Sequence, residues 1–81
     1  MSPSTFREIR EELGLTQEQL SKALGVAKLT ISQYETGFRK PGKSVVILMR
    51  VLDALPSKKA NELLRLMRTY ADDVESKGRS T

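Results

Sequence analysis

The stretch Leu13–Gly37, LGLTQEQLSKALGVAKLTISQYETG, decides the fold of this 81-residue chain because it holds two short helical patterns with almost no residues between them. The first pattern begins at Thr16, where a hydroxyl followed three residues later by Gln has the form of a capping box. It ends at Gly25, and the second pattern begins near Ala27 or Lys28 and closes at the last glycine of the stretch. Each segment has no more than about ten residues, which is too short for a stable isolated helix. We therefore expect the two helices to pack on each other.

The connection between these helices, Gly25-Val26, is short enough to force a sharp angle. Gly25 supplies the positive backbone angle that a tight turn needs. The small side chain of Ala23 lets the two helices approach each other where they cross. Two short helices at a sharp angle across a tight turn form a helix-turn-helix. In the second helix, Ile31 and Tyr34 are predicted to point inward, which leaves the opposite face exposed.

The exposed face of the second helix is predicted to read DNA bases, since a single helix fits into the major groove. Gln33 is the strongest candidate, because Gln can bind adenine through two hydrogen bonds. Lys28 can reach guanine or a phosphate, and Ser32 can meet either a base or a phosphate. Leu29 could pack on a thymine methyl group or turn inward as part of the core. The predicted base-contacting residues are Lys28, Leu29, Ser32 and Gln33.

Nine positions of this stretch together resemble the helix-turn-helix of the Xre/Cro family, which includes lambdoid phage repressors, Cro proteins, restriction-modification controllers and many antitoxins. The similarity extends over residues 6–55 and implies an all-α, lambda-repressor-like DNA-binding domain. The segment SVVILMRVLD also resembles the helix-turn-helix half of MqsA-type antitoxins, although the chain has no cysteine with which to form their zinc-binding half. The nine positions are Gln17, Leu20, Ala23, Gly25, Val26, Ile31, Tyr34, Glu35 and Gly37.

The resemblance also implies a set of phosphate contacts and one structural ion pair. Gln17 matches the family position that binds a phosphate in front of a helix N-terminus. The loop after the second helix follows the DNA backbone in the family. Arg10 and Glu35 match positions at which an Arg of the first helix pairs with a Glu of the reading helix, so we interpret Glu35 as structural. The predicted phosphate-contacting residues are Thr16, Gln17, Thr30, Arg39, Lys40 and Lys43.

The remaining pattern completes an all-α domain of five helices without a strand. A first helix is expected to begin at Thr5, which heads another capping box. Ser44 is expected to cap an apolar helix over residues 45–55, and Ser57 a longer C-terminal helix. We predict one domain over residues 1–76, with a core at 5–55, a C-terminal helix at 57–75, and a flexible tail at 77–81.

The last two helices carry more apolar surface than a single small core needs. The helix over residues 45–55 is apolar on most of its circumference, which indicates burial on more than one side. The family implies a homodimer, since its members bind half-sites about one helical turn apart. The alternative is that the last helix folds back over the first and fourth helices and completes a monomeric core. The hypothesised dimer interface consists of Val46, Met49, Leu63, Met67, Tyr70 and Val74.

The net charge of +4 is concentrated in the middle of the chain. Residues 1–19 carry two basic and four acidic side chains, whereas residues 20–52 carry six basic and one acidic. Residues 53–81 carry six basic and five acidic side chains. A basic middle segment indicates a polyanionic partner.

Several functional classes are disfavoured by what the chain lacks. It has no cysteine and no histidine, hence no thiolate metal site and no imidazole base, and we expect no enzyme activity, cofactor, metal or small-molecule ligand. RNA binding is disfavoured because at least three of the four aromatic side chains are expected to be buried. The longest apolar run, Val45–Met49, is far short of a membrane span, and no signal-peptide pattern is present, which predicts a cytoplasmic protein. The family resemblance implies a bacterial or phage origin and association with the nucleoid. The aromatic residues are Phe6, Tyr34, Phe38 and Tyr70.

The sequence thus predicts a sequence-specific double-stranded DNA-binding transcriptional regulator that binds a palindromic operator as a homodimer. Repression is favoured because a small domain without an effector domain acts most simply by occupying a promoter. The alternative is an antitoxin that binds a toxin protein and regulates its own operon.

Overall fold

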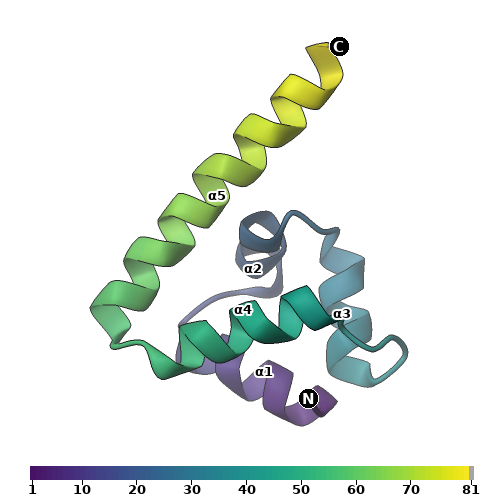
Figure 1. The fold of residues 1–81 in the computed structure, drawn as a ribbon. Helices are drawn as coiled ribbons and strands as arrows, with labels where there is room; N and C mark the ends of the chain where they lie inside the picture. The colour runs from purple at the N-terminus through teal and green to yellow at the C-terminus, as the bar shows by residue number, and fades with distance from the viewer. Residues whose placement is uncertain (81) are drawn as a thin grey trace.

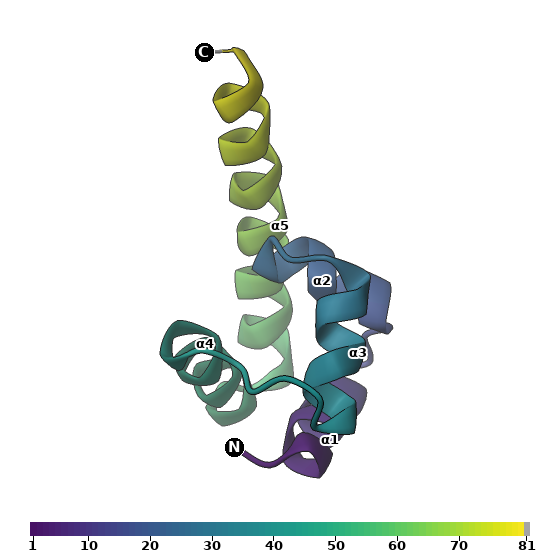
Figure 2. The same cartoon turned by 90° about the vertical axis from the view of Figure 1, so that its right-hand side faces the viewer.

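The computed structural model describes residues 1–80, with side chains described through Val74, and every regular element in that range is a helix. The helices are α1 (Pro3–Glu12), α2 (Gln17–Leu24), α3 (Lys28–Thr36), α4 (Lys43–Ala54) and α5 (Ser57–Ser80) (Figure 1). The first four helices form the body of the domain, and the C-terminal half of α5 extends beyond them in both views (Figures 1 and 2). The predicted all-α, five-helix fold is confirmed. None of the five helices, as far as they are described, combines the length and apolar character that a membrane span requires.

The start of α1 differs from the sequence prediction. The capping box predicted at Thr5 is wrong, because the helix begins at Pro3 and its N-cap is Ser2. The Ser2 hydroxyl accepts the backbone N–H of Thr5 at 3.1 Å. Proline suits the first turn of a helix, since it lacks an N–H that would have no partner inside the helix there. The pair of Ser2 and Pro3 therefore gives an earlier and better start than Thr5.

The start of α2 follows the prediction in full. The Thr16 N–H donates to Oε1 of Gln19 at 2.9 Å, and the Gln19 N–H donates to the Thr16 hydroxyl oxygen at 3.1 Å. These two bonds form a reciprocal capping box, which fixes where the support helix of the motif begins.

Helix α4 begins earlier than predicted, and α5 begins at the predicted residue but is longer. Gly42 is the N-cap of α4, so Ser44 lies inside the first turn and does not cap it. Ser57 is the first residue of α5 rather than its cap. The helix continues to Ser80, whereas the apolar pattern predicted an end at residue 75. Thr81 lies outside the described residues, and the flexibility of residues 77–81 stays a prediction.

The core consists of two adjoining clusters. The first joins α1, α2, α3 and α4, and at its centre the rings of Phe6 and Tyr34 meet edge to face with centroids 5.4 Å apart. The second joins α2 and α4 to α5 through Ala23, Leu52 and Leu64, with Ala60 beside them. The pairing of Phe6 with Tyr34 holds the reading helix against α1, since such ring contacts add to the burial of both side chains.

Two expectations about burial are corrected by this packing. Met49 is 0% exposed in the first cluster, so it lies in the core of one chain and not on a surface that a second chain could reach. Only two of the four aromatic residues are buried, Phe6 and Tyr34, instead of at least three. Phe38 lies in the loop after α3 and Tyr70 lies on α5, and both rings are exposed.

Helix α5 packs chiefly against α2 and also against α4. Its first half supplies Ala60 and Leu64 to the core. Farther along, Ala71 lies 3.9 Å from the point that a Cβ on Gly25 would occupy, so α5 also rests on the turn between α2 and α3. The monomer alternative expected the last helix to cover α1 and α4, and the structure has the contact with α4 but makes α2 the chief partner.

Candidate nucleic-acid interface

Helix α3, which the sequence predicts to be the DNA-reading helix of the motif and which we call the reading helix, has an inner and an outer face. Ile31 and Tyr34 are buried, as the spacing predicted. Lys28 is exposed and Ser32 and Gln33 are half-buried. Leu29 is 66% exposed, which decides between the two alternatives left open by the sequence: its side chain is on the surface and not in the core. The residues predicted to contact bases therefore all retain some accessible surface.

The turn before α3 has the backbone geometry that the glycine predicted. Gly25 has φ +70° and ψ +31°, the left-handed region in which a side chain is disfavoured. The Val26 N–H donates to the Ser21 carbonyl at 3.0 Å and closes the turn. Ala23 is buried at the helix crossing. These features fix the angle between α2 and α3 with few residues.

A buried ion pair joins α1 to α3. Nε of Arg10 donates to Oε2 of Glu35 at 2.6 Å, and Nη2 of Arg10 donates to Oε1 at 3.1 Å, which makes the pair bidentate. The side chains are 12% and 5% exposed, respectively. Nη1 of Arg10 donates to the Leu15 carbonyl at 2.8 Å, so the guanidinium also holds the chain between α1 and α2. The pair predicted from the resemblance is thus present in the structure.

The electrostatics of this pair favour the charged state of Arg10. The hydrogen bonds to Glu35 raise the pKa of Arg10 above its ordinary value, more than burial lowers it, and the charges of Glu35 and Glu11 act in the same direction as the hydrogen bonds. Because its ordinary pKa is already strongly alkaline, Arg10 carries its charge throughout the neutral range.

Gln17 takes part in the same network, which the sequence did not indicate. Its Nε2 donates to Oε1 of Glu35 at 3.2 Å, so α1, α2 and α3 all meet at one carboxylate. A glutamine amide has a second N–H and an oxygen that remain available for a phosphate. The predicted phosphate contact of Gln17 is therefore compatible with this bond and stays a prediction.

The loop after α3 and the first residue of α4 carry the predicted basic residues. Arg39, Lys40 and Lys43 are all exposed. The Arg39 N–H donates to the Gln33 carbonyl at 3.2 Å, which ties the loop to the end of the reading helix. Thr16 is exposed and Thr30 is half-buried, at the first turns of α2 and α3. The residues predicted to contact phosphates therefore all have accessible surface, and they come from the chain before, within and after α3.

The exposed ring of Phe38, in the same loop, is the feature that sequence reasoning missed. No local signal in the sequence indicated this exposure, because an apolar residue directly after a helix-ending glycine frequently packs back onto the helix. Among the described side chains, no group of acidic residues is placed to hold a metal ion.

Residues 6–55 match the sequence profile of the helix-turn-helix family. The chain belongs to this family. The helix-turn-helix match covers α2, α3 and the turn between them, and continues to the residue after α4. The resemblance inferred from the sequence is therefore confirmed, and it places the chain in a family of DNA-binding transcription regulators.

Three curated proteins illustrate the range of helix-turn-helix relatives. An HTH-type transcriptional regulatory protein of Methanocella arvoryzae is 34% identical over 68 residues, which are 84% of this chain and 21% of that protein. An HTH-type transcriptional regulator of Methanothermobacter thermautotrophicus is 44% identical over 50 residues, 62% of this chain and 70% of that protein. The antitoxin MqsA of Escherichia coli is 36% identical over 56 residues, 69% of this chain and 43% of that protein. The chain thus spans less than half the length of two of these relatives. No solved structure matches the chain.

Proposed function

We propose that this helix-turn-helix chain is a sequence-specific double-stranded DNA-binding transcriptional regulator that represses by occupying a palindromic operator as a homodimer. The observation that carries the proposal is that α3 is hydrogen-bonded to both α1 and α2 through Glu35. The outer face of α3 is accessible, while Glu35 binds Arg10 of α1 and Gln17 of α2. A reading helix held in this way by both neighbouring helices can enter the major groove as a rigid element.

The proposed base contacts follow from the accessible residues of α3. Gln33 would bind adenine, Lys28 would bind guanine or a phosphate, and Leu29 would pack on a thymine methyl group. The last assignment is supported by the exposure of Leu29, since a leucine buried in the core could not meet a base. Ser32 would contact a base or a phosphate.

The proposed phosphate contacts supply affinity that does not depend on sequence. Arg39 and Lys40 are exposed cations in the loop after α3, and Lys43 is an exposed cation at the start of α4. The structure shows none of them in an ion pair with a described side chain. Thr16, Gln17 and Thr30 would add hydrogen bonds from the starts of α2 and α3.

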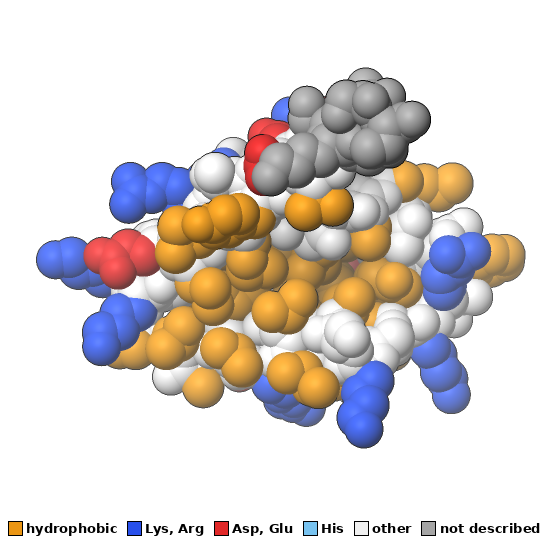
Figure 3. All heavy atoms as spheres, turned by 45° about the horizontal axis from the view of Figure 1, so that its top comes forward, with side chains coloured by type: hydrophobic (Ala, Val, Ile, Leu, Met, Phe, Trp, Pro, Cys, Tyr) orange, Lys and Arg blue, Asp and Glu red, His pale blue; other side chains and the backbone are white. Residues whose placement is uncertain are grey.

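The proposed homodimer is supported by an apolar surface on the last two helices. Apolar side chains occupy the middle of the face seen in Figure 3, and basic side chains lie around its edge. A contiguous exposed apolar surface on a small domain is typical of an interaction site. The exposed large apolar residues of α4 and α5 are Ile47, Val51, Leu66, Tyr70 and Val74.

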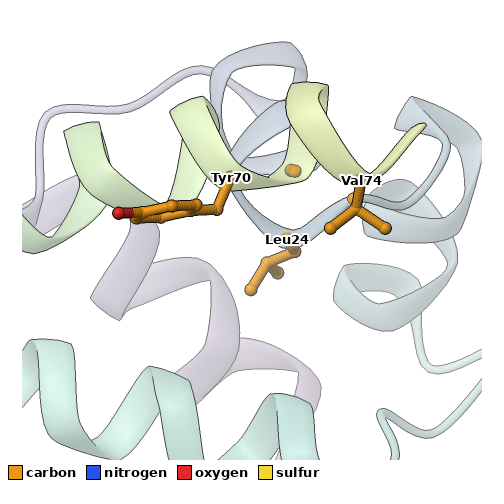
Figure 4. A pocket seen from close by; sticks show the side chains of 5 residues that line it. Leu24, Tyr70 and Val74 are labelled. Carbon is orange, nitrogen blue, oxygen red and sulfur yellow. The ribbon is translucent and has the colours of Figure 1, made fainter. Parts of the chain in front are cut away.

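A groove between α2 and α5 adjoins this surface. It has a volume of about 460 Å³ and is lined by Leu24 and Gly25 on one side and by Tyr70, Ala71 and Val74 on the other (Figure 4). We propose that the dimer interface includes this groove. Of the residues hypothesised from the sequence, Tyr70 and Val74 remain the central members. Val46, Leu63 and Met67 are half-buried and would contribute their accessible parts, whereas Met49 is replaced by Ile47 and Val51.

Selection of bound duplexes from random-sequence DNA tests the function. We expect enrichment of a palindrome whose half-sites are centred about one helical turn apart, because two reading helices related by a twofold axis reach successive major grooves. Enrichment of no sequence would contradict sequence-specific binding. Enrichment of a single, non-palindromic half-site would retain DNA binding and contradict the homodimer.

A second candidate function is favoured by the similarity to MqsA, whose name describes an antitoxin. In that case the apolar face of α4 and α5 would bind a toxin protein, and DNA binding would serve autoregulation. Co-expression with the product of the adjacent gene distinguishes the two functions. We expect a stable complex and relief of growth inhibition if the chain is an antitoxin, and neither result if it is a regulator alone. The bacterial or phage origin stays a prediction.

A further inference from the structure

Phe38 is the most exposed of the large apolar side chains that the structure describes, with 80% of its surface accessible. It belongs to neither core cluster. A single exposed apolar side chain is common on protein surfaces, so exposure alone carries no conclusion. The segment that presents Phe38 is what distinguishes it.

The backbone is anchored on both sides of Phe38. Gly37 has φ +83°, and a Cβ built on it would lie 3.3 Å from Cγ of Pro3, so this glycine rests against the start of α1. On the other side, the Arg39 N–H donates to the Gln33 carbonyl at 3.2 Å. The ring is therefore held in solvent by a backbone attached to the end of the reading helix.

The side chains next to Phe38 are cationic. Arg39, Lys40 and Lys43 are exposed, and within the part of the chain with described side chains no carboxylate pairs with them. An apolar ring that is followed in the chain by Arg39 and Lys40, with Lys43 five residues on, is complementary to a polymer in which anionic and apolar groups alternate. The DNA backbone is such a polymer, since each phosphate is followed by a deoxyribose.

We propose that Phe38 packs against a deoxyribose of the DNA backbone, beside the phosphates that Arg39 and Lys40 bind. This inference rests on the proposed DNA-binding function and adds to it an apolar contact. Every nucleotide of DNA carries the same sugar, so the contact increases affinity without reading sequence. It also releases no counterions, because the phenyl ring is uncharged.

A second copy of the chain fits this site less well. Two such loops facing each other would bring six like charges together, three from each chain, and like charges across an interface are unfavourable. The apolar residues available for a dimer lie instead on α4 and α5.

The test compares wild type, Phe38→Ala and Phe38→Leu on two duplexes, one enriched by selection and one of unrelated sequence, over a series of salt concentrations. We expect Phe38→Ala to bind both duplexes about tenfold more weakly, which corresponds to ~1.4 kcal/mol. Phe38→Leu should recover most of this loss, and neither variant should change the salt slope. Arg39→Ala is the matched control for charge, and it should lower the slope by about one unit. Gln33→Ala is the control for base reading, and it should weaken the selected duplex alone.

A fluorescent variant gives an independent measurement. The chain contains no tryptophan, so Phe38→Trp introduces a single reporter at the site. We expect either duplex to protect its emission from acrylamide, and self-association of the free protein to leave it unprotected.

Four results would overturn the proposal. In the binding series, these are equal DNA affinity of Phe38→Ala and wild type, or a loss of affinity that is confined to the selected duplex. The other two are weaker self-association of Phe38→Ala in the absence of DNA, and acrylamide quenching of Phe38→Trp that DNA does not change. Thermal melting of Phe38→Ala should match that of wild type, because the ring is exposed. If the wild-type protein binds neither duplex, the proposed function itself is contradicted. If wild type and Phe38→Ala bind DNA equally well, only the role of Phe38 is contradicted.

Discussion

Nε of Arg10 lies 2.6 Å from Oε2 of Glu35, and this contact fixes the reading helix to the first helix of the domain. The carboxylate also accepts a hydrogen bond from Gln17, so the three N-terminal helices converge on one side chain.

Glu35→Gln should destabilise the domain by about 3–5 kcal/mol, because it leaves the buried Arg10 guanidinium without a countercharge. Urea unfolding followed by circular dichroism measures this change. Glu11→Gln is the matched control, since Glu11 pairs with Arg7 at 3.2 Å with both side chains more than half exposed. That control should cost no more than about 0.3–0.5 kcal/mol. Equal effects of the two variants would show that the buried pair does not orient α3.

The contribution of Arg10 to stability should be independent of pH through the neutral range. Its folded pKa is raised, so the stabilisation is fully present below the pKa of the unfolded chain and is lost only as pH rises through the higher folded value. Both values lie in the strongly alkaline range. The difference in unfolding free energy between wild type and Arg10→Met should therefore stay constant from about pH 6 to about pH 9. A difference that shrinks across this interval would contradict the assignment.

Gly25→Ser should destabilise the domain by about 1–2 kcal/mol, because its left-handed backbone conformation is unfavourable for a residue with a side chain. The nearest atom to a new Cβ, on Ala71, is at an ordinary contact distance of 3.9 Å, so the cost arises from the backbone and not from a clash. Gly42→Ser is the matched control. Gly42 has φ −66° and caps α4, and serine is a good N-cap, so this variant should be as stable as wild type or slightly more stable. Thermal melting of both variants checks the prediction.

Gln33→Ala should relax operator preference at one base pair and cost about 1–3 kcal/mol on the selected duplex. Lys43→Ala serves as the comparison. It should weaken binding to all sequences alike and lower the salt slope by about one unit. Binding measured on a set of single-base operator variants separates the two effects. If Gln33→Ala kept the wild-type preference at every position, Gln33 would not read a base.

Tyr70→Ser should weaken self-association without lowering the stability of the monomer, because 64% of the Tyr70 side chain is exposed. Asn61→Ser, another exposed residue of α5 but one that lines a different, charged groove, should leave association unchanged. Sedimentation equilibrium at tens of micromolar measures both. A wild type that remains monomeric at these concentrations, and does not associate on operator DNA, would remove the basis for the dimer.

The fold was predictable where one local signal had no competitor. Thr16 caps α2 as expected, since no other residue nearby could start that helix. Thr5 failed because Ser2 and Pro3 offered a second start, and a capping box alone does not rank the two. The helical period alone could not predict that Leu29 is exposed and that Met49 is buried. That period identifies which residues share a face, whereas the packing of the other helices decides which face is covered.

The candidate site was predictable in its residue types and less so in its contacts. Arg10 and Glu35 came from the family resemblance, whereas the bond of Gln17 to the same carboxylate depends on three helices meeting at one point in space, which the spacing of residues along the chain does not specify. The exposure of Phe38 was missed for a related reason. Its direction is set by Pro3 and Gln33, which lie on two different helices.

The proximity of Ala71 to the turn at Gly25 would couple α5 to the proposed operator binding. A ligand that fills the groove beside Tyr70 touches the same turn that sets the angle of the reading helix. If such a ligand changes the affinity for DNA by some factor, DNA must change the affinity for that ligand by the same factor. Binding of the operator would then change the affinity of α5 for its ligand, although α5 itself need not contact DNA.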